Sequence, residues 1–258
     1  MLEVFRVELR RSFIEFVRYP LESLGGIVIT TSIFYSLFLS AQYIAGPTAR
    51  QFGERIDAIL VGYILWDLVV FITSDIAGGL QKEAQTGTLE QLFLSPFGAP
   101  RIFLIRAAAE LTVHLILMVC ILLVIMALTG SQLSFPPILF LPLGTVLLGA
   151  YGIAFIMGSI ALLFKRISRL VGMFQFVLLF LMTAPTETWT GSLSLARWLL
   201  PMTAGAGLLR DLMARGKTLD LRELSLALLS GIGYFAIGLL IFRFLERQAK
   251  KQGMLGGY

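Results

Sequence analysis

The sequence predicts an all-α integral membrane protein with six transmembrane helices. Its residues are 57% hydrophobic and only 14% charged, whereas a soluble domain carries about 25% charged residues on its wetted surface. The apolar residues also gather in runs of the length that a helix needs, about 20 residues, to cross roughly 30 Å of hydrocarbon. Much of the surface is therefore expected to face lipid.

The apolar runs and their interruptions give the boundaries of the spans. The uncharged stretch between Glu110 and Lys165 is too long for one crossing, and the turn-forming residues 130–137 divide it in two. The predicted spans are residues 24–44, 58–80, 102–128, 138–164, 170–185 and 224–242. These spans and their loops use nearly the whole chain, so we expect one transmembrane domain over residues 1–258 and no separate catalytic domain.

The distribution of lysine and arginine predicts the orientation. Fourteen of these residues fall on the face that holds both chain ends, and seven fall on the opposite face. Because cytoplasmic loops are enriched in basic residues, both termini are expected to be cytoplasmic. The N-terminus alternates acids and bases from Glu3 to Arg18, so no cleavable signal peptide is expected.

Residues 1–20 have the pattern of an amphipathic helix. Apolar residues recur there at spacings of three or four, at Leu2, Phe5, Leu9, Phe13 and Phe16. Such spacing places them on one helical face, and Pro20 ends the run. A Phe-rich face beside arginines favours a helix lying in the cytoplasmic membrane interface. The alternative is an exposed helix packed on the protein.

Motifs of the common enzyme classes are absent from the sequence. There is no G-x-x-x-x-G-K-[ST] loop, no H-E-x-x-H and no G-x-S-x-G, so nucleotide, zinc-protease and hydrolase sites of those designs are excluded. One histidine and the single Cys120 cannot form a tetrahedral zinc site or an intrachain disulfide by themselves. We therefore expect no catalytic residues and no metal site. The basic residues are dispersed, so no nucleic-acid partner is expected either.

The loop after the second span is the most informative segment. It reads KEAQTGTLEQLFLSPFGAPR from Lys82 to Arg101. Leu89, Leu92 and Phe93 form an apolar patch at helical spacing, which predicts a short amphipathic helix over residues 82–96. Such a helix can dock into a groove of a soluble partner; a solvated loop is the alternative.

The loop also carries a family resemblance. The pattern E-x-x-x-G-T-L-E-x-L-x-x-S-P, formed by Glu83, Gly87, Thr88, Leu89, Glu90, Leu92, Ser95 and Pro96, resembles the corresponding loop of type-2 ABC transporter permeases. A second segment, from Leu199 to Leu212, is similar to that family's "NPLT…LR" segment, with Leu200 where asparagine is usual. The Pro-rich stretch often found upstream in the family is replaced by TETWTGSLSLARW.

The resemblance implies half of an ATP-driven exporter in the plasma membrane of a prokaryote. The chain would pair with a second copy or a related permease, and two copies of a soluble ATPase would bind ATP and Mg²⁺, with no cofactor in this chain. The loop would be the coupling helix, which seats in the ATPase through Glu83, Gly87, Thr88, Leu89, Glu90 and Leu92. The cargo would be a hydrophobic or amphipathic molecule such as a drug, a lipid or a lipid-linked glycan.

Three ionisable residues in predicted spans are candidates for a translocation path: Asp67, Glu110 and His114. A charge at the bilayer centre costs at least about 2.5–3.5 kcal/mol, so Asp67 should face protein or water. Arg106 and Glu110 have the i, i+4 spacing of an ion pair on one helix. The structural alternative is interhelical hydrogen bonding that fixes the bundle. Asp75 is expected to be merely solvated near the cytoplasmic end.

The outer segment, residues 187–221, contains apolar stripes on either side of Pro201. Two short re-entrant helices would explain them, with Trp189 and Trp198 at headgroup level. These helices would form either an outer gate or a cap over the last two spans.

Two other classes of function compete with the exporter. A proton-coupled secondary transporter would use Asp67, Glu110 and His114, but it predicts internal repeats that the sequence does not show convincingly. Its transport would persist without an ATPase and collapse with the proton gradient. A membrane-embedded enzyme acting on lipids would need a cluster of catalytic or metal-binding groups, which a single histidine disfavours.

Overall fold

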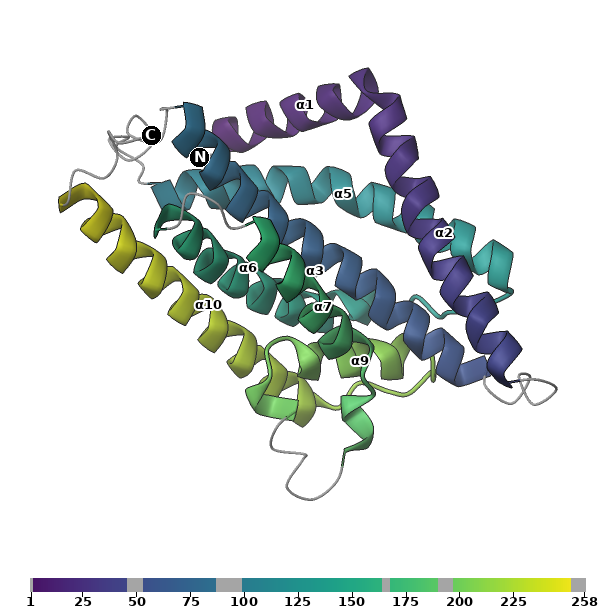
Figure 1. Ribbon diagram of the computed structural model, residues 1–258. Coiled ribbons are helices and arrows are strands. Elements are labelled where there is room, and N and C mark those ends of the chain that lie inside the picture. The colour runs from purple at the N-terminus through teal and green to yellow at the C-terminus, as the bar shows by residue number, and fades with distance from the viewer. Residues whose placement is uncertain (1, 46–52, 87–98, 164–167, 190–196, 252–258) are drawn as a thin grey trace.

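The computed structural model describes residues 2–45, 53–86, 99–163, 168–189 and 197–251, and over these ranges it contains helices and no strand (Figure 1). The α-helices are α1 (Leu2–Arg18), α2 (Pro20–Ala45), α3 (Gly53–Thr86), α5 (Ala99–Thr129), α6 (Phe140–Leu163), α7 (Ser168–Thr183), α9 (Thr203–Met213) and α10 (Leu221–Lys251). Two short 3₁₀ turns, η2 (Pro137–Leu139) and η3 (Thr186–Thr188), precede α6 and follow α7. The predicted all-α class is confirmed.

Four helical segments in the described ranges are long and apolar enough to cross a membrane. They are Ile56–Glu83, Arg101–Thr129, Pro137–Ala161 and Leu221–Gln248. Two shorter apolar segments, Leu24–Ser40 and Arg169–Thr183, occupy the first and fifth predicted spans. The chain is thus a multi-pass membrane protein, and the count of six crossings stays a prediction.

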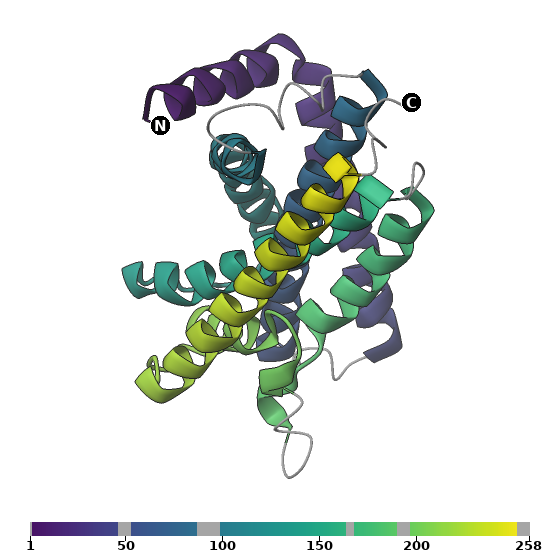
Figure 2. The same cartoon turned by 90° about the vertical axis from the view of Figure 1, so that its left-hand side faces the viewer.

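The helix α1 forms a separate arm at one end of the molecule. In Figures 1 and 2 it lies at the same end as the last turns of α3 and α10, while α9 lies at the opposite end. Pro20 opens α2 directly after α1 and has no backbone N–H to continue the α1 ladder, so the chain turns there. The α1 arm packs against α5. We call these two regions the α1 end and the α9 end.

The interior of the bundle is formed mainly by α3 and α6, and α10 packs along α6 from the outside. Leu60, Leu68 and Val69 of α3 are completely buried. The helices α6 and α10 touch through small residues: a side chain on Gly238 would overlap the backbone of Gly152, and one on Gly231 would lie 2.7 Å from the Thr145 carbonyl oxygen. Because lipid supplies no hydrophobic force between helices, such close backbone contact is the source of van der Waals attraction.

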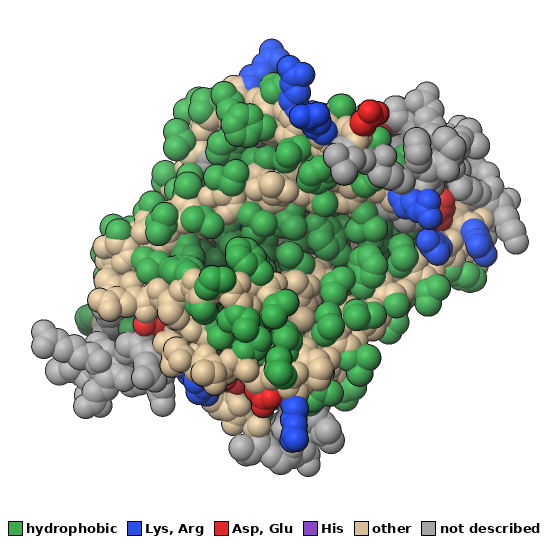
Figure 3. All heavy atoms as spheres, turned by 180° about the vertical axis from the view of Figure 1, so that it is seen from behind, with side chains coloured by type: hydrophobic (Ala, Val, Ile, Leu, Met, Phe, Trp, Pro, Cys, Tyr) green, Lys and Arg blue, Asp and Glu red, His purple; other side chains and the backbone are tan. Residues whose placement is uncertain are grey.

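The outer surface has the character of a lipid-facing belt. Figure 3 shows one face on which hydrophobic side chains fill a broad, hollowed middle zone while lysine and arginine gather toward the margins. Phe176, Met173 and Phe140 are 70–75% exposed in the isolated chain. In water such a surface would aggregate, whereas in a bilayer it is the favoured boundary with the acyl chains.

Candidate functional site

The three predicted path residues lie on two adjacent helices near the α1 end. Asp67 belongs to α3, and Glu110 and His114 belong to α5. The Oδ2 atom of Asp67 lies 3.3 Å from Nε2 of His114, and both side chains are less than one fifth exposed. The imidazole stacks on Phe71, with ring centroids 3.8 Å apart. The structure therefore joins Asp67 and His114 across α3 and α5, although 47 residues separate them in the sequence.

This carboxylate–imidazole pair is not locked by a hydrogen bond. Both Asp67 Oδ2 and His114 Nε2 are buried, and neither has a hydrogen-bond partner of good geometry among the described residues. Their separation suits an ion pair when the imidazole is protonated. A buried polar atom without a hydrogen bond is costly, so this pair has hydrogen-bonding capacity left for a water molecule or a ligand group.

A second group of charges joins the same two helices closer to the loop. Arg106 Nε donates to Glu110 Oε1 at 3.2 Å, which confirms the predicted i, i+4 pair. Its Nη1 donates to Glu83 Oε1, also at 3.2 Å. Asp75 interacts with Glu110 as well. The expectation that Asp75 is merely solvated is wrong, because α5 packs beside α3 and brings the Glu110 carboxyl against it.

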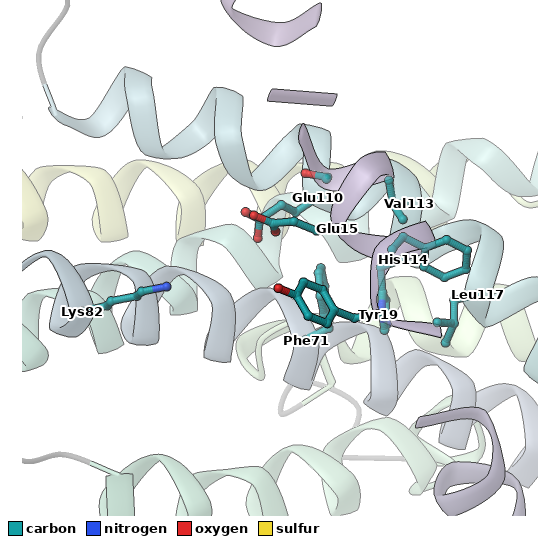
Figure 4. A pocket seen from close by; sticks show the side chains of 10 residues that line it. Glu15, Tyr19, Phe71, Lys82, Glu110, Val113, His114 and Leu117 are labelled. Atoms are coloured by element: carbon teal, nitrogen blue, oxygen red, sulfur yellow. The ribbon is translucent and has the colours of Figure 1, made fainter. Parts of the chain in front are cut away.

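A cavity of about 450 Å³ opens between α1, α3 and α5 beside these charges (Figure 4). Figure 4 shows Glu15, Glu110, Lys82 and His114 around the same space, with Tyr19 beside Phe71. The remaining lining residues are Ser12, Phe16, Val113 and Leu117. The cavity combines charged groups with aromatic rings, which suits an amphipathic ligand.

Of the six predicted coupling residues, only Glu83 falls within the described ranges. Its carboxylate is held by Arg106 at 3.2 Å. Gly87, Thr88, Leu89, Glu90 and Leu92 lie outside the described residues, so the coupling helix over 82–96 stays a prediction. The structure nevertheless links the last turn of α3, where this loop begins, to the charges on α5.

At the opposite end, α9 is an almost completely buried helix. Its residues from Thr203 to Arg210 and Leu212 are buried, and Gly205 allows it to lie directly against Thr145 of α6. Met202 precedes it with a φ of 65°, a left-handed conformation that is uncommon for a residue with a side chain. The outer segment thus contains one α-helix, α9, in its described part. The pair of short helices and their re-entrant placement in the membrane stay predictions.

The deepest ion pair of the described chain ties α9 to the turn after α7. Arg210 and Glu187 have side chains only 1% and 3% exposed, and Arg210 Nη2 lies 2.6 Å from Glu187 Oε2. Arg210 Nη1 donates to the Met182 carbonyl oxygen at 2.5 Å, and Arg215 Nη1 donates to Glu187 at 2.9 Å. Every partner that these two side chains need is thus present, as buried charges require.

The electrostatics of this pair follow from its partners. Burial raises the pKa of Glu187, but the hydrogen bonds and charge of Arg210, together with the charge of Arg215, outweigh burial and hold that pKa below its ordinary value. Burial acts in the opposite direction on Arg215, whose pKa is nevertheless raised by its contacts with Asp211 and Glu187. Sequence reasoning singled out neither Arg210 nor Glu187, although Arg210 stands beside Leu208, Leu209 and Leu212 of the outer segment.

The two predicted gate tryptophans make separate contacts in the described structure. Trp189 follows η3, and its backbone N–H donates to the Thr186 carbonyl oxygen at 3.3 Å. Trp198 lies under the Arg197 guanidinium, whose carbon is 4.9 Å from the ring centroid, and Arg197 pairs with Glu223 of α10 at 3.0 Å. Trp198 therefore belongs to the packing between α9 and α10, and a gate role for either ring stays a prediction.

The described residues contain no group of three or more His, Cys, Asp or Glu side chains that could hold a metal ion. Cys120 is a free, exposed thiol on α5.

Comparison with known families gives one match. A model described as ABC-2 type transporter matches residues 3–214, which covers every described helix except α10 and includes both polar sites. The chain belongs to the ABC-2 type transporter family. A comparison with curated proteins gives no match. As a member of this family, the chain is a membrane-embedded transport component and not a catalytic subunit.

Proposed function

We propose that this chain is the transmembrane permease subunit of an ATP-driven exporter that moves a hydrophobic or amphipathic molecule outward by alternating access. The observation that carries the proposal is the ABC-2 match over residues 3–214 of a multi-pass chain. The sequence itself has no P-loop, which fits a division of labour with two copies of a separate ATPase that bind ATP and Mg²⁺. The second permease is another copy of the chain or a related one.

The topology proposed is six crossings in a prokaryotic plasma membrane, with both termini in the cytoplasm. The helix α1 then lies in the cytoplasmic interface, and α9 re-enters from outside without crossing. Two features support this arrangement. The α1 arm and the loop end of α3 share one end of the molecule, opposite α9. The basic residues are twice as numerous on the face assigned to the cytoplasm.

The coupling route proposed runs from the loop at residues 87–98 through α3 and α5. The helix α3 has 34 residues, so it is about 50 Å long and extends from the loop deep into the bundle. Glu83, in its last turns, is tied to α5 through Arg106. A force applied by an ATPase at Gly87, Thr88, Leu89, Glu90 and Leu92 would therefore shift α3 and α5 together.

The cargo class is supported by apolar cavities within the bundle. One of about 400 Å³ lies between α3, α5, α6 and α9, and it is lined only by hydrophobic side chains, among them Leu65, Met118, Phe135 and Leu209. Another of about 360 Å³ lies between α2, α3 and α7 beside Phe38 and Tyr63. Apolar cavities of this kind accept hydrocarbon readily. A drug, a lipid or a lipid-linked glycan would fit this lining, and a small ion would not.

The test is to disturb the loop and measure coupling. Glu90→Arg and Gly87→Pro are expected to leave the chain folded but to abolish cargo transport that depends on ATP in reconstituted vesicles. Glu90→Arg reverses the charge offered to the ATPase, and Gly87→Pro removes a backbone N–H and restricts the turn. Arg101→Gln, at the exposed last position of the loop and outside the predicted coupling helix, is the control. Unchanged coupling in both loop variants would contradict the coupling-helix assignment.

A second candidate function is favoured by one observation, the contact of 3.3 Å between Asp67 and His114. A secondary transporter would use this pair and Glu110 to carry protons. In vesicles that lack any ATPase, such a protein would transport its cargo until the proton gradient is dissipated. The exporter would transport nothing under the same conditions.

A further inference from the structure

A groove of about 690 Å³ runs between α1 and α5. It lies along a different face of α1 from the cavity of Figure 4: five of its lining residues come from the first thirteen of the chain, and none of these lines the other cavity. The lining consists of Arg6, Val7, Leu9, Arg10 and Phe13 of α1 with Thr112, Val113 and Ile116 of α5. No acidic residue lines it.

Two arginines that line this groove have no ion-pair partner among the described residues. Arg11 of the same helix is paired with Glu8 at 3.6 Å and with Glu15 at 3.1 Å. Arg6 and Arg10 form no ion pair with any residue in the described ranges. Their i, i+4 spacing places both guanidinium groups on one side of α1. Planar guanidinium groups bind phosphate oxygens in pairs.

The rest of the groove is apolar and open. Val7 is 67% exposed, Phe13 is 54% exposed, and Ile116 on α5 is 55% exposed. Two cations beside an accessible apolar surface match one ligand chemistry, an anionic head joined to a hydrocarbon chain. A soluble anion would leave the apolar half uncovered, and a neutral lipid would leave the arginines without a counter-charge.

We propose that this groove binds an anionic phospholipid of the leaflet in which α1 lies. Its phosphate contacts Arg6 and Arg10, and one acyl chain covers Val7, Phe13 and Ile116. The bound lipid bridges α1 and α5, the helix that carries Arg106, Glu110 and His114. The inference rests on the proposed membrane placement of α1, and it is independent of export, of the ATPase and of the cargo.

The experiment measures lipid binding to the purified full chain in mild detergent by native mass spectrometry. The chain is titrated with a phosphatidylglycerol, with a phosphatidylcholine of identical acyl chains, and with glycerol phosphate. Wild type is expected to bind phosphatidylglycerol about 10- to 30-fold more tightly than phosphatidylcholine, because each basic residue near an anionic surface contributes about fivefold. Glycerol phosphate is expected neither to bind measurably nor to displace the lipid.

The decisive variant is Arg6→Gln combined with Arg10→Gln, which is expected to lose the preference for phosphatidylglycerol. The matched control, Arg18→Gln combined with Arg243→Gln, removes the same charge from exposed positions outside the groove and is expected to keep it. Arg6→Lys combined with Arg10→Lys keeps the charge without the paired donors, and it is expected to give an intermediate preference. This variant replaces the Gln variant if the latter does not fold.

Three results would overturn the proposal. These are equal affinity of wild type for the two lipids, equal loss of preference in the decisive and control variants, and displacement of the lipid by glycerol phosphate, which would indicate a site for free phosphate. No ATPase, ATP or cargo is present, so a negative result leaves the exporter proposal standing. A failure of transport that depends on ATP likewise leaves this one standing.

Discussion

The two ends of the bundle hold charges in opposite ways. At the α9 end, Glu187 and Arg210 are 3% and 1% exposed and fully hydrogen-bonded. At the α1 end, Arg106, Glu110 and Glu83 are 20–23% exposed and adjoin a cavity. The pair of Asp67 and His114 lacks a good hydrogen bond there. The α9 end is thus built to keep one arrangement, whereas the α1 end has space and unused hydrogen-bonding capacity for a change of partners.

This difference suits a transporter that is driven from one side. A buried, saturated ion pair resists change because removing either partner strands a charge in a low dielectric. Charges beside a cavity exchange partners at lower cost, since water and neighbouring side chains can replace what is lost. The α9 end would then act as the fixed frame against which α3 and α5 move.

The largest expected effect comes from breaking the saturated pair. Arg210→Met leaves the buried Glu187 carboxylate with only its contact to the more exposed Arg215. The variant is expected to reduce the free energy of unfolding by about 3–5 kcal/mol, measured as chemical or thermal unfolding in detergent. Adding Glu187→Met should restore much of the loss. Arg215→Met, which removes the more exposed partner of Glu187, is the control. Equal losses in Arg210→Met and Arg215→Met would contradict the claim that the buried pair of Arg210 and Glu187 stabilises the α9 end.

The next effect concerns the close contact between α6 and α10. Gly238→Ala places a methyl group against the backbone of Gly152 and is expected to cost about 1–3 kcal/mol of stability. Gly233→Ala on the same helix meets nothing within 4 Å, so it should be neutral or slightly stabilising. Indistinguishable unfolding curves for the two variants would mean that α6 and α10 pack less closely than in this structure.

A smaller effect on stability is expected at the α1 end. Arg106→Met removes a partly exposed cation from Glu110 and Glu83 and should cost about 1 kcal/mol or less, because solvent screens such pairs. Transport that depends on ATP should fall by much more than this loss of stability explains. A stability loss as large as that of Arg210→Met, with normal transport by the folded fraction, would contradict this account. It would mean that Arg106 stabilises the fold and is not needed for transport.

The smallest effect is the dependence on pH of the α9 end. The pKa of Glu187 is lowered in the folded chain, so its contribution to stability is present above its ordinary pKa of 4.5 and is lost as pH falls through the folded value. Wild type should therefore lose more thermal stability than Glu187→Gln between pH 7 and pH 4. Parallel losses in the two proteins would show that Glu187 is not held as an anion by Arg210.

The sequence predicted features that depend on local pattern. Hydropathy located the apolar helices, and the i, i+4 spacing of Arg106 and Glu110 predicted their pair. Contacts between side chains on different helices could not be predicted from such local patterns. Asp67 and His114 were both candidates, but nothing local indicated that α3 and α5 would place them 3.3 Å apart. Arg210 and Glu187 are 23 residues apart. They form a buried ion pair only because α9 packs inside the bundle, and the sequence does not indicate that packing.

The most direct test of the central claim, that the loop after α3 seats in a separate ATPase, is photocrosslinking in native membranes. A photoreactive residue replaces Leu89 in the loop, and the control replaces Leu199, which is 74% exposed near the α9 end. The account predicts that position 89 yields a dominant product containing a P-loop ATPase and that position 199 yields none. Absence of that product at position 89, or its appearance only at position 199, would contradict it.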